Sequence, residues 1–259
     1  MFEFESEKIK QIIKNQVEDI LPDFELSGFL TKGSKMIRSK LCLSYLKTHD
    51  IGISENVLKI ITAGELIHNA SLLHDDVIDD ADYRRGNLTV WKKFSPKISV
   101  ICGDYLVSVA VNILSGIENF DILNSFNKCV QEMSKAEIKQ FLLRNKKPNV
   151  EEYIDICEGK TAELFYTMLK SCLIVSSEEF DYTESFAKLY GVSFQLNNDF
   201  SESSTVQDKK NGIYNIVDIL GIEKAKILSD NYKEEMRNLI KKMPDNGWRV
   251  ELESLVNGL

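Results

Sequence analysis

Apolar side chains recur at helical spacing along most of the chain. Ile9, Ile13 and Val17 follow one another at intervals of four residues, which predicts an amphipathic helix that ends before Pro22. The same pattern predicts further helices over residues 35–47, 55–80, 88–116, 119–144, 150–176, 179–203 and 222–241. Breaks between them are predicted at residues 50–52, 85–87, 147–149 and 211–212, where Gly, Pro, Asn and Asp gather.

Sparse helix breakers favour one helical bundle. The 259 residues include only four prolines and 13 glycines, which is typical of long helices rather than of many short strands. No sequence repeat and no long linker divides the chain. The sequence therefore predicts an all-α, single-domain helical bundle over residues 1–259.

Charge and cysteine usage restrict the possible partners and location. A net charge of -8 argues against a general nucleic-acid surface, although it allows a small basic site for an anionic ligand. The five cysteines lie far apart without a CxxC pair, and the first residues contain no secretory apolar segment. We therefore expect buried thiols and a cytoplasmic protein. We also expect no membrane span, because no apolar run approaches the required length.

Five aspartates lie within residues 75–82, at the end of an apolar helical pattern. Asp75 and Asp79 are one turn apart and share a helix face, while Asp76 lies about 100° around the axis. Carboxylates this close repel one another unless cations hold them, so a divalent-metal site is one interpretation. The alternative is a solvated helix end.

Three features favour the metal site over the solvated helix end. The preceding turn is apolar, which indicates a buried helix. Aspartate at a helix C-terminus opposes the helix dipole, an unfavourable placement that function can explain. Arg84 and Arg85 follow, and their guanidinium groups suit phosphate oxygens. Together these groups predict a magnesium–diphosphate site, whereas EF-hand spacing is absent and neither His68 nor His74 has neighbouring zinc ligands in the sequence.

The order of these motifs resembles that of the trans-isoprenyl diphosphate synthases, also called polyprenyl synthases, over residues 30–215. The sequence DDVID at residues 75–79 followed by RRG at 84–86 is similar to the family's first aspartate-rich motif. GSKMIR at 33–38 resembles the family's GGKRIR, and ELIH at 65–68 resembles the stretch that carries the histidine for the homoallylic diphosphate. CGDYL at 102–106 and GKTAELF at 159–165 resemble two further family signatures.

The second aspartate-rich motif departs from the family pattern. The family's FQxxDDxxD reads FQLNNDFSE at residues 194–202, so Asp199 is its one retained aspartate, with Asn198 before it and Glu202 after it. The lysine-bearing loop that follows is shortened. An ordinary polar helix end is the alternative interpretation of this stretch.

The resemblance implies an isoprenoid-synthase-like fold with a central cavity and a Mg²⁺-dependent condensation of an allylic diphosphate with isopentenyl diphosphate. It implies three Mg²⁺ ions with bound diphosphate and a homodimer. Five residues are implied as metal ligands: Asp75, Asp76, Asp79, Asp199 and Glu202. The three first-motif aspartates, Asp199, Arg84 and Lys160 are implied as catalytic groups that stabilise charge on the leaving diphosphate.

A second set of residues is implied to bind the substrates. These residues are Lys35, Arg38, His68, Arg84, Arg85, Lys160, Thr161 and Gln195. Each has a simpler alternative: Lys35 and Arg38 can form a solvated face, His68 can be a core histidine, and Lys160 can pair with a nearby glutamate. As a set they favour an anion site, because a basic cluster in an acidic chain calls for an anion.

Product length depends in this family on the residues four and five positions before the first aspartate. These are Ser71 and Ala70, where short-chain members place an aromatic residue. Small side chains imply a deep apolar tunnel and a product of geranylgeranyl length or longer, with Leu106 or Ile113 as candidates for the tunnel floor. Plain helix packing by small residues is the alternative.

Four functions fit the sequence. The first is a medium- or long-chain polyprenyl diphosphate synthase. The second is a poorly active or regulatory subunit of a heteromeric synthase, which Asn198 and Glu202 favour. The third is a short-chain synthase making farnesyl or geranylgeranyl diphosphate. The fourth is a terpene-cyclase-like enzyme, which would not require isopentenyl diphosphate.

Overall fold

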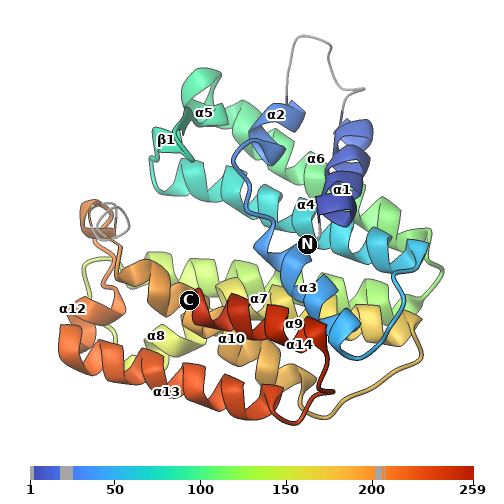
Figure 1. Ribbon diagram of the computed structural model, residues 1–259. Coiled ribbons are helices and arrows are strands. Elements are labelled where there is room, and N and C mark those ends of the chain that lie inside the picture. Colours follow the sequence, from blue (N-terminus) through green and yellow to red (C-terminus); the bar gives the residue numbers. More distant parts are fainter. Residues whose placement is uncertain (1–2, 18–25, 202–205, 207) are drawn as a thin grey trace. The chain divides into compact units, whose positions relative to one another are not determined.

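Helices dominate the described part of the chain (Figure 1). The computed structural model describes residues 3–17, 26–201, 206 and 208–259. Its helices are α1 (Glu3–Val17), α2 (Leu26–Thr31), α3 (Ile37–Thr48), α4 (Glu55–Ile78), α5 (Val90–Lys93), α6 (Pro96–Ser115), α7 (Phe120–Leu142), α8 (Val150–Cys157), the π-helical turn η1 (Glu158–Ala162), α9 (Glu163–Val175), α10 (Thr183–Asp199), α12 (Ile216–Leu220), α13 (Ile222–Ile240) and α14 (Gly247–Asn257). In these ranges the strands are β1 (Tyr83–Arg84) and β2 (Asn87–Leu88), which form one antiparallel hairpin. The all-α prediction is confirmed.

The chain forms two compact units. The first unit comprises Met1–Leu43 and Ile53–Leu123, and the second comprises Ser44–Gly52 and Asn124–Leu259. Helices α3 and α7 each begin in the first unit and end in the second. A single domain over residues 1–259 stays a prediction.

The first unit is built around α4 and α6, which pack along each other (Figure 1). Ser54 caps α4, since its hydroxyl accepts a hydrogen bond from the backbone N–H of Val57. The close approach of α6 requires Gly103, because a Cβ atom there would lie 2.2 Å from Nε2 of His74 on α4. This packing fixes the end of α4 that carries the aspartates.

The helix predicted over residues 88–116 is wrong in its first third. Residues 87–88 form β2, α5 covers Val90–Lys93, and α6 starts at Pro96. Ser95 is extended, with φ -171° and ψ 161°, and its side chain accepts a hydrogen bond from the N–H of Ile98. A residue that precedes proline avoids the α conformation, and proline is well suited to the first helical position. The Ser95–Pro96 pair therefore starts a new helix.

Helix α6 is long and strongly apolar. Its most apolar 18-residue window has a mean hydropathy of 1.7, and 39% of that window is buried in the protein. By length and composition alone this helix could cross a membrane, so the argument from length does not hold. One such helix is not a clear membrane span, and the lack of a span stays a prediction. Within the first unit, α6 packs against α4 and α5.

The second unit is organised around α10, which packs against α9, η1 and α13 (Figure 1). Gly191 makes this possible, because a Cβ atom there would lie 2.3 Å from the Cα atom of Ala162 in η1. A buried cluster lies beside this contact and includes Tyr153, Cys157, Val192, Leu196 and Ile216. It surrounds the C-terminal end of α10, where the second aspartate motif lies.

Other predicted elements agree with the structure to different degrees. The helix predicted over 222–241 is confirmed as α13, and the stretch 150–176 is helical throughout, although η1 interrupts its α-helical geometry. The prediction over 179–203 starts four residues too early, and its last two residues lie outside the described ranges, as do residues 18–25 after α1. Helices α2, α12 and α14 and the β-hairpin were not predicted. All five cysteines are free and buried, as expected.

Candidate active site

The first aspartate motif forms the C-terminal turn of α4. The N–H of Ala81 donates to the carbonyl oxygen of Asp76 at 3.0 Å, and the N–H of Asp80 donates to that of Val77 at 3.5 Å. This is the hydrogen-bond pattern of a Schellman motif, with Asp80 in the left-handed position at φ 48°. The carboxylates of Asp75 and Asp79 therefore lie one turn apart on one face of the last turn.

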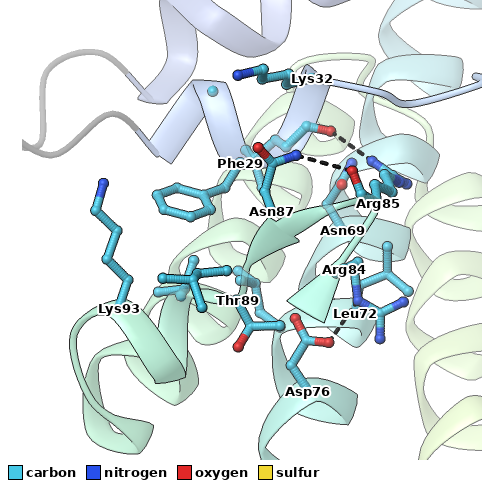
Figure 2. A pocket seen from close by; sticks show the side chains of 15 residues that line it. Phe29, Lys32, Asn69, Leu72, Asp76, Arg84, Arg85, Asn87, Thr89 and Lys93 are labelled. Atoms are coloured by element: carbon cyan, nitrogen blue, oxygen red, sulfur yellow. Dashed lines mark hydrogen bonds and ion pairs between the residues drawn. The ribbon is translucent and has the colours of Figure 1, made fainter. Parts of the chain in front are cut away.

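Asp76 is buried and paired with Arg84. Asp76 is 3% exposed. Nε of Arg84 donates a hydrogen bond to Oδ1 of Asp76 at 2.6 Å (Figure 2). Burial raises the pKa of the Asp76 carboxyl, and the nearby positive charge of Arg84 opposes that rise. The structure thus places an arginine of the RRG sequence beside the aspartate cluster.

The RRG sequence forms the turn of the β-hairpin. Arg84 pairs with Asn87 across the hairpin, so Arg85 and Gly86 are the two turn residues, with φ angles of 51° and 76°. Two positive φ angles are the signature of a type I′ turn, which explains the glycine. The turn directs Arg85 toward α2, where its Nη1 donates to the carbonyl oxygen of Leu30 at 3.4 Å (Figure 2).

A basic cluster surrounds His68 in the first unit. Burial lowers the pKa of His68 well below its ordinary value, and the positive charges of Arg38, Arg85 and Arg84 lower it further. His68 is therefore neutral and can offer a single N–H donor. Arg38 is buried, whereas Lys35 precedes α3 and is exposed. The structure thus brings His68 together with all three predicted arginines.

A cavity of about 330 Å³ lies on the hairpin side of α4 (Figure 2). Residues of α2, α4, the hairpin and α5 line it, so it belongs wholly to the first unit. The lining residues are Gly28, Phe29, Leu30, Lys32, Asn69, Leu72, Leu73, Asp76, Arg84, Arg85, Asn87, Leu88, Thr89, Val90 and Lys93. No sequence pattern indicated this cavity, because its walls come from four separate stretches of chain.

Lys160 and Thr161 lie in the π-helical turn of the second unit. Nζ of Lys160 forms an ion pair with Glu137 on α7 and donates to Oε1 of Gln140 at 2.7 Å. The simpler alternative for Lys160 was an ion pair with a nearby glutamate. Lys160 does form such an ion pair, but its partner lies on another helix. Thr161 is buried. Single π-turns inside helices are frequent at functional sites, so this geometry marks the GKTA stretch as unusual.

Asp199 lies in the interior of the second unit and is 2% exposed. Its Oδ2 accepts hydrogen bonds from the hydroxyl of Tyr153 at 2.6 Å and from the N–H of Ile216 at 3.0 Å. Its Oδ1 accepts one from Nε2 of Gln195 at 3.0 Å. Burial raises the pKa of the Asp199 carboxyl, while these three donors oppose the rise. In this structure Asp199 joins α8, α10 and the start of α12.

The predicted metal ligands do not form a cluster of three side chains in the described part of the chain. Among the described residues, no three acidic, histidine or cysteine side chains converge as they would around a metal ion. Asn198 is partly buried on α10, and Glu202 lies outside the described residues. Mg²⁺ needs no such cluster, because proteins often bind it through one or two carboxylates together with substrate phosphates and water. The carboxylates at the end of α4 fit that mode.

The two residues predicted to set product length differ in their surroundings. Ala70 is 1% exposed and lies in the packed part of α4. Ser71 is partly exposed, and its hydroxyl donates to the carbonyl oxygen of His68 at 2.9 Å. Of the two, Ser71 is the more exposed.

The chain matches known proteins over most of its length. A family model described as polyprenyl synthetase matches residues 25–242. A prenyl transferase from Cyanidium caldarium is 33% identical over 187 residues, which are 68% of this chain and 57% of that protein. Heptaprenyl diphosphate synthase from Staphylococcus aureus has a TM-score of 0.86 at 23% identity, over 98% of this chain and 96% of that one. Geranyltransferase from Helicobacter pylori, solved with magnesium and isoprenyl diphosphate, has a TM-score of 0.79 at 23% identity, over 98% of this chain and 94% of that one.

The solved structures and the curated relatives support different conclusions. At 23% identity the solved structures establish the fold alone, and they confirm the isoprenoid-synthase-like prediction. The matched region spans 57%, 38% and 44% of three curated relatives, from Cyanidium caldarium, Arabidopsis thaliana and Dictyostelium discoideum. The names of the relatives range from a short chain isoprenyl diphosphate synthase to a decaprenyl-diphosphate synthase.

The contacts of Asp199 predict a stability effect for Tyr153→Phe. The change removes one of three donors to a buried carboxylate, so we expect a loss of about 1–3 kcal/mol in the free energy of unfolding. Urea denaturation followed by circular dichroism measures it. Tyr83→Phe is the control, because Tyr83 is 68% exposed. Equal stability of the two variants would contradict a structural role for the Asp199 contacts.

Proposed function

The chain belongs to the polyprenyl synthetase family, and from this premise we propose that it is a trans-prenyltransferase. It would condense an allylic diphosphate with isopentenyl diphosphate and release diphosphate. The observation that carries the proposal is the contact between Asp76 and Arg84 at 2.6 Å, which places an aspartate-rich helix end beside a paired-arginine turn. Such a pairing suits a diphosphate that must leave with its charge stabilised.

The first motif would act on the leaving diphosphate. Asp75, Asp76 and Asp79 supply the hard oxygen ligands that Mg²⁺ prefers, and bound Mg²⁺ would act as a Lewis acid toward the diphosphate. Arg84, held against Asp76, would contact a diphosphate oxygen with its remaining N–H groups. The proposal includes three Mg²⁺ ions, a number that rests on the family resemblance.

The basic cluster would bind isopentenyl diphosphate. Lys35, Arg38 and Arg85 supply positive charge, and neutral His68 supplies one N–H donor without adding repulsion among the arginines. Fixing this substrate would hold its double bond near the developing allylic cation, so that attack becomes effectively intramolecular. Lys160, Thr161 and Gln195 complete the proposed substrate-binding set in the second unit.

The second motif differs from the first in how its aspartate is held. Both oxygens of Asp199 accept hydrogen bonds, so a metal at Asp199 would share these oxygens with Tyr153 and Gln195. Its neighbour Asn198 is partly buried and offers a neutral oxygen. Ligation by Asp199 and by Glu202 stays a prediction.

The activity proposal is tested by a turnover assay. The purified chain is incubated with Mg²⁺, radiolabelled isopentenyl diphosphate and farnesyl diphosphate, and the products are separated by length. We expect elongated products, and we expect Asp76→Asn to lower the rate by about 10²–10³-fold, because metal ligation contributes several kcal/mol. Asn keeps an oxygen for Arg84, which favours a folded variant.

Asp80→Asn is the matched control for that assay. It removes a charge from the same turn, and asparagine tolerates the left-handed conformation of residue 80. A rate within about twofold of the unchanged chain is expected. Turnover without isopentenyl diphosphate would instead favour the terpene-cyclase-like function.

A second candidate function is a poorly active or regulatory subunit that pairs with a catalytic synthase. The observation that favours it is the second motif, where Asn198 stands in place of the family's aspartate and Asp199 accepts hydrogen bonds through both oxygens in the interior. A folded chain that is inactive with every allylic primer would support this candidate over the first.

Asn198→Asp separates the two candidates. If the chain is a synthase with a weakened second metal wall, the added carboxylate should lower the Mg²⁺ concentration for half-maximal rate by about threefold or more. Asn197→Asp adds the same charge one residue earlier and should leave that concentration unchanged. A Mg²⁺ response that does not differ between the two variants would refute this role for position 198.

The proposal also covers the length of the product. We propose a product of geranylgeranyl length or longer, because Ser71 and Ala70 are small. Ser71→Phe should shorten the main product, since a ring at this partly exposed position would block the path of the growing chain. Ser71→Ala keeps the space and should leave the length unchanged. The same product distribution in both variants, at retained turnover, would contradict the tunnel.

Three further parts of the proposal concern the domain, the oligomeric state and the location. A single catalytic domain is supported by the family model, which runs through both compact units from residue 25 to residue 242. A homodimer follows from the resemblance alone, whereas the proposed cytoplasmic location rests on the widely spaced, free cysteines. Light scattering of the purified chain measures its oligomeric state.

A further inference from the structure

Glu65 is a buried acidic residue to which the proposed mechanism gives no role. It lies on α4, three residues before His68, and only 1% of it is exposed. Residues three apart on a helix are neighbours on its surface, so Glu65 and His68 share a face of α4. A carboxylate buried this deeply is costly unless hydrogen bonds or positive charge compensate it. The contacts of Glu65 therefore indicate what it does.

One oxygen of Glu65 holds the start of α3. Its Oε1 accepts a hydrogen bond from the backbone N–H of Ser39 at 3.0 Å and a second one from the Ser39 hydroxyl at 2.7 Å. Ser39 is the third residue of α3, so its N–H is among those that a helix start leaves without an acceptor inside the helix. Glu65 thus caps α3 from another helix.

The residue that precedes α3 is poorly suited to this task. Met36 has a φ of 50°, whereas an N-cap residue is normally extended. Its thioether sulfur is at best a weak acceptor, unlike the side-chain oxygens of the usual N-cap residues. The first turn of α3 therefore takes its side-chain acceptor from α4, and Glu65 fixes this turn to the helix that carries His68.

The turn held by Glu65 carries Arg38. Arg38 precedes Ser39 directly and is 8% exposed. Burial lowers the pKa of His68, and the positive charge of Arg38 is the next largest cause, so the two side chains lie near each other. Because Glu65 is hydrogen-bonded to Ser39 and shares a helix face with His68, it sets the spacing between Arg38 and His68.

The negative charge of Glu65 also acts on Arg85. Burial lowers the pKa of Arg85 and the charge of Arg84 lowers it further, while the charge of Glu65 opposes this fall most strongly. Glu65 is therefore linked to the basic cluster in two ways, to Arg38 through Ser39 and to Arg85 through its charge.

We propose that Glu65 is a positioning residue for isopentenyl diphosphate. Through Ser39 it holds Arg38 at the distance from His68 at which both side chains contact one diphosphate group. Glu65 itself does not touch the substrate, since a carboxylate in contact with a diphosphate would repel it. This role rests on the proposed function, because it concerns a substrate of that reaction.

Steady-state kinetics with each substrate varied in turn tests this role. Glu65→Met removes the acceptor for Ser39, and the KM for isopentenyl diphosphate should rise about tenfold or more. The KM for the allylic diphosphate should change by less than about threefold, because the first aspartate motif is unaltered. Glu65→Gln keeps an oxygen that accepts from Ser39, so its KM for isopentenyl diphosphate should stay within about threefold of that of the unchanged chain.

Ser54→Ala is the matched control. Ser54 caps the start of α4, so this change also removes a helix cap from the first unit, but one that holds no residue of the basic cluster. Ser54→Ala should lower the melting temperature and leave the KM for isopentenyl diphosphate unchanged. A KM that rises equally in Ser54→Ala and Glu65→Met would mean general loosening of the unit and would overturn the proposal.

A double-mutant cycle tests whether Glu65 acts through Arg38. Arg38→Gln alone should raise the KM for isopentenyl diphosphate. Adding Glu65→Met to Arg38→Gln should raise it by less than about threefold more, because the positioned side chain is already absent. Effects that multiply independently would overturn the proposal, and so would equal KM values in Glu65→Gln and Glu65→Met.

Calorimetric titration with isopentenyl diphosphate separates the failure of this role from the failure of the proposed function. If the unchanged chain neither turns over nor binds this diphosphate, the proposed function is refuted and the role of Glu65 with it. If the unchanged chain binds and Glu65→Met binds equally well, the positioning role alone is refuted. Should Glu65→Met not fold, Ser39→Ala takes its place. It removes one of the two donors to Glu65 and should raise the Kd by about threefold.

Discussion

The buried carboxylate of Asp76 and the guanidinium of Arg84 form the contact on which the first unit's site depends. A carboxylate that is 3% exposed is costly unless a positive charge and hydrogen bonds compensate it. Because Arg84 belongs to β1, the pair fastens the hairpin to the end of α4. The turn that follows then places Arg85 toward α2, so one ion pair also positions a wall of the cavity.

Charge is distributed unevenly in this acidic protein. Arg38, Arg84 and Arg85 lie near His68, and burial together with their positive charges lowers the pKa of that histidine. A neutral imidazole can sit among arginines without adding to their repulsion, whereas a lysine there would add to it. The aspartates at the end of α4 lie on the neighbouring stretch of the same unit. Opposite charges are thus concentrated within a short length of chain, while the rest of the surface carries the net negative charge.

Sequence reasoning succeeded where the physics is local. The period of 3.6 residues identified α4 and α13, and the contact of Arg84 with Asp76 spans only eight residues. Sequence reasoning failed where an element is very short or where a contact joins residues far apart in the chain. The two-residue strands are too short to show an alternating pattern. The sequence analysis also predicted one continuous helix across Ser95–Pro96, although a new helix starts there. The donors to Asp199 include Tyr153, 46 residues earlier, so no spacing rule could have shown that this aspartate is a buried anchor.

The π-helical turn over residues 158–162 restricts how this stretch can vary in length. A π-turn accommodates one residue more than the α-helical path around it. Deleting one residue would restore a regular α-helix, but it would rotate everything before the turn by about 100° relative to α9. Tyr153 would then swing away from Asp199, and Gly159 would leave its close packing against Ala136. Related chains should therefore differ here by substitution, while insertions and deletions should collect in the loops outside α8 and α9.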